Sequence, residues 1–191
     1  MKTALPIAAV LMLSACFDSA PEQLSLSYGA HAPSPVMVLS FTVNAAPEPA
    51  TPLVVFGAAD SGYPRTSGTR TGGSWPGDGG TASISATWVE LLTDRAYSAT
   101  LDVPTADLPR SASDAAQVAA IFGPNGLLVL AGDSVETMPE YINIAQACGT
   151  RAPAQDQDFA AAPLAHARLT EALAVAHPPV PATTTCPEPA Q

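Results

Sequence analysis

The clearest hydrophobic pattern in the chain is an alternation of apolar and small polar residues on both sides of a short turn. Apolar residues take every second position in residues 84–88 and, after a turn at residues 93–95, again in residues 97–103. A period of two is typical of strands with one buried and one exposed face. This stretch predicts an antiparallel hairpin in which Trp88 is a core anchor rather than a ligand platform.

Four further stretches have the composition of strands. Residues 24–28 alternate, residues 36–43 and 53–56 are rich in branched and apolar side chains, and residues 127–130 form a continuous apolar run. Branched residues favour strands, and an unbroken apolar run is typical of a strand buried on both faces. The N-terminal two thirds of the chain are therefore expected to be rich in sheet.

Three segments favour helices. Residues 113–122 begin at a Ser-Asp cap and end before Gly-Pro, and residues 163–176 place leucines at helical spacing. Residues 135–149 are ambiguous, because a Pro-Glu start favours a helix although residues 141–144 alternate like a strand. The helix is the preferred prediction there.

These elements predict an α+β fold: a single antiparallel, sandwich-like sheet packed by one to three short helices. The folded domain is expected over residues 24–150. Residues 151–191 are expected to form a polar linker, a C-terminal helix and a proline-rich tail.

A long glycine-rich loop interrupts the predicted sheet at residues 57–80. It contains eight glycines and few large side chains, so its ordering entropy is poorly offset. Aromatic and arginine side chains favour binding, and long loops often carry function, so the candidate binding residues are Tyr63, Arg65, Arg70 and Trp75. The alternative is a disordered insertion without a role.

The N-terminus has the pattern of a lipoprotein precursor. Lys2 precedes an apolar run at residues 4–13, and Leu13-Ser14-Ala15 leads directly to Cys16. Such a run is too short to span a bilayer and is typical of a secretory signal. We expect residues 1–15 to be the signal, Cys16 to carry diacylglycerol and palmitate, and residues 16–23 to form a tether. An aspartate directly after the cysteine would favour the inner membrane. Phe17 occupies that position instead, so we expect the outer membrane. The alternatives are a plain secretory signal whose cysteine later pairs, or a chance apolar N-terminus.

Lipidation of Cys16 would leave Cys148 and Cys186 as an even pair in an oxidising periplasm, where we expect them to form a disulfide rather than two free thiols. The 191-residue chain has a formal net charge of −10, and its only lysine lies in the signal. An acidic surface repels nucleic acid, which argues against that class of partner.

No pattern of catalytic or metal-binding residues accompanies these features. His31, His166 and His177 lack the spacing of a zinc site, so no metal, cofactor or catalytic residue is predicted. The preferred hypothesis is a non-enzymatic envelope protein, anchored to the membrane by its lipid, that binds a partner protein or an envelope component. The alternatives are a periplasmic hydrolase with a site around residues 57–80, and a structural envelope spacer.

Several of these features together resemble a family of uncharacterised bacterial lipoproteins, catalogued as a domain of unknown function. The shared features are the cysteine motif at residues 13–16, an aromatic-Gly-Ala element at residues 28–33, and the succession of Trp88, Tyr97 and Pro104 in the predicted hairpin. The resemblance covers about two thirds of the mature chain; the alanine- and proline-rich C-terminal third departs from it. It implies a small α+β lipoprotein and, because some relatives are encoded beside secreted antibacterial toxins, an immunity-type role.

Overall fold

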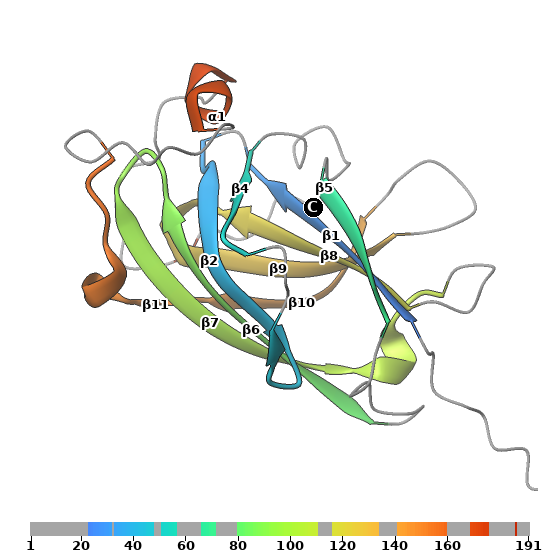
Figure 1. Cartoon of the computed structure of the whole chain (residues 1–191). Helices are drawn as coiled ribbons and strands as arrows, with labels where there is room; N and C mark the ends of the chain where they lie inside the picture. Colours follow the sequence, from blue (N-terminus) through green and yellow to red (C-terminus); the bar gives the residue numbers. More distant parts are fainter. Residues whose placement is uncertain are drawn as a thin grey trace, which may run out of the picture.

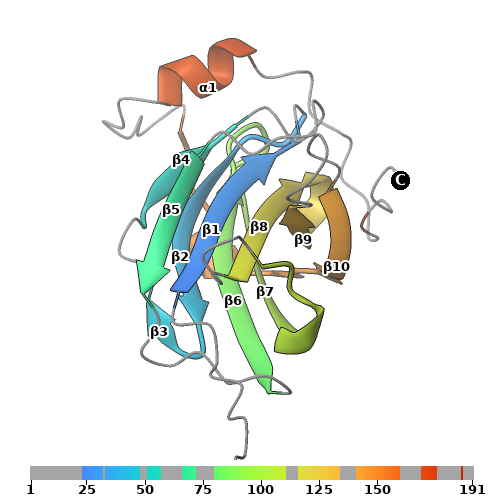
Figure 2. The same cartoon turned by 90° about the vertical axis from the view of Figure 1, so that its right-hand side faces the viewer.

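The computed structural model describes residues 23–31, 33–47, 51–56, 66–71, 80–110, 116–133, 141–159, 169–175 and 186. Within these residues the strands form two sheets that lie face to face, as Figures 1 and 2 show from two directions.

The first sheet has the strand order β10-β9-β8-β1-β5. Its strands are β1 (Gln23–Ala30), β5 (Thr66–Thr71), β8 (Ala116–Gly123), β9 (Leu127–Asp133) and β10 (Tyr141–Cys148). Strands β1 and β8 pair in parallel, whereas the other neighbours are antiparallel.

The second sheet has the order β11-β7-β6-β2-β3, and β4 also pairs with β2. Its strands are β2 (Val36–Val43), β3 (Ala46–Pro47), β4 (Leu53–Val55), β6 (Thr81–Glu90), β7 (Arg95–Pro104) and β11 (Thr150–Arg151). The connections include the short 3₁₀ helices η2 (Thr105–Asp107), η3 (Pro124–Gly126) and η4 (Pro153–Gln155).

The main core lies between the two sheets, because both contribute side chains to one buried cluster. Trp88 of β6 is fully buried there, and its ring lies 5.3 Å from that of Phe122 of β8 across the interface. Burial of large aromatic surfaces is a major source of stabilisation in a domain of this size.

Each sheet also buries part of its outer face. The outer face of the second sheet packs against Phe159 and the helix α1 (Leu169–Val175), and that of the first sheet packs against Cys186. Segments from the C-terminal part of the chain therefore contact both layers.

The predicted hairpin is confirmed residue by residue. Strands β6 and β7 pair antiparallel with Trp88 opposite Tyr97, and alternate residues of β6 are buried as the sequence pattern indicates. The predicted strands at 24–28, 36–43, 53–56 and 127–130 correspond to β1, β2, β4 and β9. The described part of the predicted helix at 163–176 is α1.

The expected α+β fold with a single antiparallel sheet is wrong in detail, because the described residues are mostly strand and form two sheets that include a parallel pair. The largest error is the helix predicted at residues 113–122, where β8 begins at Ala116. Strand β8 lies between β1 and β9 and is apolar on both faces, so its alternation is hidden. Tertiary packing overrides the helix propensity of its alanines.

The helix preferred at residues 135–149 is also wrong over its described part, which is β10. The register of β10 against β9 shifts between Asn143 and Ala145, so the alternation of the strand is interrupted there. The expectation of one glycine-rich loop over 57–80 is wrong at β5, which pairs with β1 along the edge of the first sheet. Main-chain hydrogen bonds form that ladder, and they leave no hydrophobic signature in the sequence.

Candidate functional site

The structure describes few of the side chains that the sequence marks as functional. Arg70 lies in β5 opposite Leu24, and only its backbone is described. Outside the described residues lie Cys16, Tyr63, Arg65 and Trp75. The loop proposed as a binding surface therefore stays a prediction.

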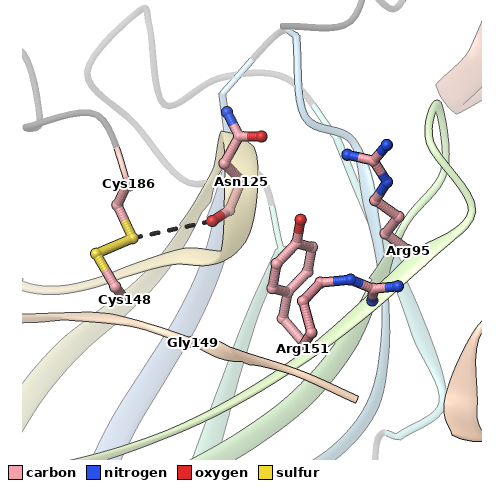
Figure 3. Close-up of a pocket in the computed structure, with 7 residues that line it drawn as sticks. Arg95, Asn125, Cys148, Gly149, Arg151 and Cys186 are labelled. Atoms are coloured by element: carbon pink, nitrogen blue, oxygen red, sulfur yellow. Dashed lines mark hydrogen bonds between the residues drawn. A yellow bond between two sulfur atoms is a disulfide. The ribbon is translucent and has the colours of Figure 1, made fainter. Parts of the chain in front are cut away.

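Cys148 and Cys186 are joined by a disulfide, with their Cα atoms 5.6 Å apart. The bond connects the end of β10 to a residue packed on the outer face of the first sheet. Beside it is a pocket of about 440 Å³, shown in Figure 3. The pocket is lined by Arg95, Tyr97, Asn125, Cys148, Gly149, Arg151 and Cys186.

The turn η3 between β8 and β9 forms one side of the pocket. Asn125 and Gly126 both have positive φ angles, of 58° and 82°. A Cβ atom on Gly126 would lie 2.4 Å from Cδ1 of Tyr97, so the ring and the turn can approach this closely only with glycine at that position. The backbone N–H of Gly149 donates to the carbonyl of Gly126 at 2.7 Å and ties the end of β10 to the same turn.

Glu90 is a buried carboxylate next to this turn, with 4% of its surface exposed. Its Oε1 accepts a hydrogen bond from the backbone N–H of Gly126 at 3.0 Å, and its Oε2 accepts one from the hydroxyl of Thr93 at 2.8 Å. Burial raises the pKa of Glu90, and these hydrogen bonds oppose that effect. Glu90 thus links the second sheet to a turn of the first.

The raised pKa of Glu90 predicts a specific pH dependence of stability. The folded state binds the proton of the Glu90 carboxyl group more tightly than the unfolded chain does. The protonated group therefore stabilises the fold below the unfolded pKa of about 4.5, and this stabilisation is lost as the pH rises through the folded pKa. In Glu90→Gln the amide oxygen can still accept from Gly126, and the group no longer titrates. The free energy of unfolding of the variant is expected to rise relative to that of wild type as the pH rises from 4 to 8. It is measured by urea unfolding at intervals of one pH unit. A constant difference across that range would contradict the assignment.

Tyr97 lines the pocket and packs against two neighbouring side chains. Its ring stacks against Trp88 with a centroid separation of 6.1 Å. The guanidinium of Arg151 lies 5.2 Å from the centroid of the Tyr97 ring and makes a cation–π contact with it. Burial raises the pKa of Tyr97, and the nearby Glu90 raises it further. The phenol therefore stays protonated at neutral pH and can donate a hydrogen bond.

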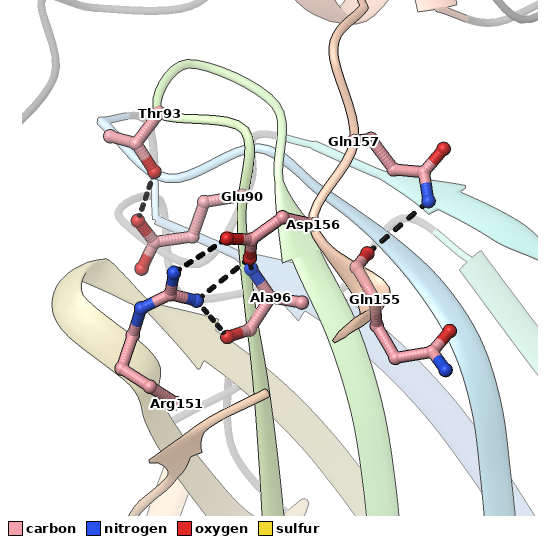
Figure 4. A network of polar contacts seen from close by, with 7 residues as sticks. All are labelled: Glu90, Thr93, Ala96, Arg151, Gln155, Asp156 and Gln157. Atoms are coloured by element: carbon pink, nitrogen blue, oxygen red, sulfur yellow. Dashed lines mark hydrogen bonds and ion pairs between the residues drawn. The ribbon is translucent and has the colours of Figure 1, made fainter. Parts of the chain in front are cut away.

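Arg151 is fixed by a bidentate ion pair with Asp156, as Figure 4 shows. Its Nη1 and Nη2 donate to Oδ1 and Oδ2 of Asp156 at 2.9 and 2.8 Å, and Nη1 also donates to the carbonyl of Ala96. Oδ1 of Asp156 accepts from the backbone N–H of Ala96 at 2.7 Å. The hydrogen bonds from Arg151 lower the pKa of Asp156. Residues 151–156, expected as a polar linker, are thus attached to β7.

The site combines cations and hydrogen-bond donors rather than metal ligands. Two arginines and a neutral phenol line an open pocket, and one of the arginines is already paired with a carboxylate. Among the residues that the structure describes, no group of three or more histidine, cysteine or acidic side chains could hold a metal ion. The arrangement is suited to binding a polar or anionic group.

The sequence does not mark Arg95, Tyr97 and Arg151 as site residues, because their patterns predict a turn residue, a core residue and a linker residue. Two signals were present. Arg95 and Tyr97 are two apart at the start of a predicted strand, which places them on one face. Arg151 follows Cys148 by three residues, so the predicted disulfide already places it beside Cys186.

In the described part of the chain, no helix is long and apolar enough to cross a membrane. No protein-family model, curated protein or solved structure matches the sequence or fold of this chain.

Proposed function

We propose that the protein is a lipid-anchored component of the bacterial cell envelope that faces the periplasm and binds a partner protein or an envelope component without catalysing a reaction. The observation that carries the proposal is the pairing of Cys148 with Cys186. It uses two of the three cysteines and leaves Cys16, the residue that follows Leu-Ser-Ala, for lipidation. Disulfides persist in oxidising compartments such as the periplasm, which agrees with export by the predicted signal.

The pocket beside the disulfide supports binding as the activity. It presents arginine and tyrosine side chains at the end of the β6–β7 hairpin, and these residue types are enriched where binding energy is concentrated. Its volume lies within the range of about 300–1,000 Å³ that is usual for ligand sites. The pocket is therefore our preferred binding surface among the described residues. The immunity-type role implied by the family resemblance is one form of such binding. Phe17 favours the outer membrane as the location of the protein.

The anchor is tested by labelling cells with radioactive palmitate. Wild type is expected to incorporate the label and to sediment with membranes, because two or more acyl chains give stable anchoring. Cys16→Ser is expected to lose both the label and the membrane association. Cys148→Ser is the matched control, since it also replaces one cysteine with serine and should keep the label. Equal label in wild type and Cys16→Ser would refute the anchor.

A further inference from the structure

We propose that the pocket between β7, η3 and the disulfide binds a single carboxylate group of a small ligand or a peptide end, held by the guanidinium of Arg95 and the hydroxyl of Tyr97. The inference deepens the proposed function, on which it rests, by naming the chemical class of the ligand.

Arg95 is the cation that remains available in the pocket. The guanidinium of Arg151 donates to both carboxylate oxygens of Asp156 and to the carbonyl of Ala96, so most of its donors and its charge are already used. Arg95 lines the same pocket, is partly exposed, and forms no salt bridge within the described residues. A planar guanidinium matches the two oxygens of a carboxylate with parallel hydrogen bonds.

Tyr97 supplies a second donor at a fixed position. Only 5% of its surface is exposed, and its ring contacts both Trp88 and Arg151. Arg95 and Tyr97 both line this pocket, and Arg95 is close enough to influence the pKa of the phenol. A donor pair that needs no rearrangement loses little conformational entropy when a ligand binds.

The charges around the pocket favour one negative charge over two. Asp156 forms an ion pair with Arg151, and both Glu90 and Asp156 lie within electrostatic range of Arg95, so the pocket carries little net positive charge. The whole chain is acidic, with a formal net charge of −10, and its field opposes a dianion. A monovalent carboxylate therefore fits this site better than a phosphate.

The rest of the pocket offers contact for the uncharged part of the ligand. The disulfide and Gly149 form a wall with little hydrogen-bonding capacity. A Cβ atom on Gly149 would lie 2.9 Å from the ring of Trp88, so the wall runs close to the core. Since the pocket is much larger than one carboxylate, a small aliphatic portion or a peptide backbone can follow the charged group into it.

The test is calorimetric titration of the full chain, purified in detergent, with acetyl-trialanine, its C-terminal amide, acetate and inorganic phosphate. Acetyl-trialanine is expected to bind and its amide to bind at least about tenfold more weakly, as loss of a charged hydrogen-bond partner implies. If acetate binds as tightly as acetyl-trialanine, the carboxylate is confirmed and its source is a small acid rather than a peptide end. Equal binding of acid and amide, tighter binding of phosphate, or no binding of any carboxylate would overturn the proposal.

Variants locate the site. Arg95→Gln is expected to weaken binding of acetyl-trialanine about 10- to 100-fold, Tyr97→Phe less, and Arg95→Lys to restore part of the loss. Arg110→Gln, which removes an arginine outside the pocket, is the matched control and should bind like wild type. Equal binding by wild type and Arg95→Gln would place the ligand elsewhere. Because Cys16→Ser should bind the peptide normally, failure of this titration is distinguishable from failure of the lipid anchor.

Discussion

Replacing Trp88 with alanine should lower the free energy of unfolding by about 3–5 kcal/mol, the largest effect expected of a single substitution in this protein. Trp88 is fully buried between the sheets and contacts Phe122 of one sheet and Tyr97 of its own. Its removal leaves a cavity that both layers border, and neither can collapse into it without separating from its neighbours.

Two further variants make this result specific. The indole N–H of Trp88 has no hydrogen-bond partner among the described residues, so Trp88→Phe loses packing area but no hydrogen bond and should cost much less. Leu173→Ala in α1, where 42% of the leucine is exposed, should stay within about 0.5 kcal/mol of wild type. The measurement is unfolding in urea, monitored by the circular dichroism of the backbone, which does not depend on a tryptophan signal. A Trp88→Ala variant as stable as Leu173→Ala would contradict the two-sheet core.

Removing the disulfide should cost about 4 kcal/mol, the second large effect. Cys148 and Cys186 are 38 residues apart, and closing a loop of that length restricts the unfolded chain by this amount in the chain-entropy model. The double variant Cys148→Ser/Cys186→Ser is expected to melt about 8–16 °C below wild type, given the usual scaling for a domain of this size.

Reduction provides the control for that variant. Wild type treated with a reductant should melt near the double variant, and the double variant itself should not respond to the reductant. Counting free thiols shows whether reduction is complete. If fully reduced wild type keeps its melting temperature, the disulfide does not hold the C-terminal segment to the first sheet.

The strands with one polar face were predictable because their alternation survives in the sequence. In β6 the less buried positions are serine and threonine and the buried ones include Ile84 and Trp88, so the period of two is visible. Strand β8 has no polar face. Val118 and Phe122 face the main core while Ile121 faces the outer cluster, and the result resembles a helix-forming alanine segment. Its parallel pairing with β1 depends on contacts distant in sequence, which no local pattern contains.

The candidate site was only half predictable for a similar reason. The cysteine pair followed from counting thiols in an oxidising compartment. The role of Glu90 depends on its proximity to Gly126, 36 residues away, and that of Arg151 on its contact with Tyr97. A pocket formed by a hairpin end, a turn from the other sheet and a short edge strand is a product of topology, and of its lining residues the sequence marks only the cysteine pair as a set.

The most direct test of the account is the mass of the protein extracted from native membranes, intact and after non-reducing digestion. We predict a chain that begins at Cys16, carries diacylglycerol and an N-terminal acyl group there, contains no free thiol, and yields one peptide pair linked through Cys148 and Cys186. A chain with an unmodified Cys16, or a disulfide that joins Cys16 to either of the other cysteines, would contradict it.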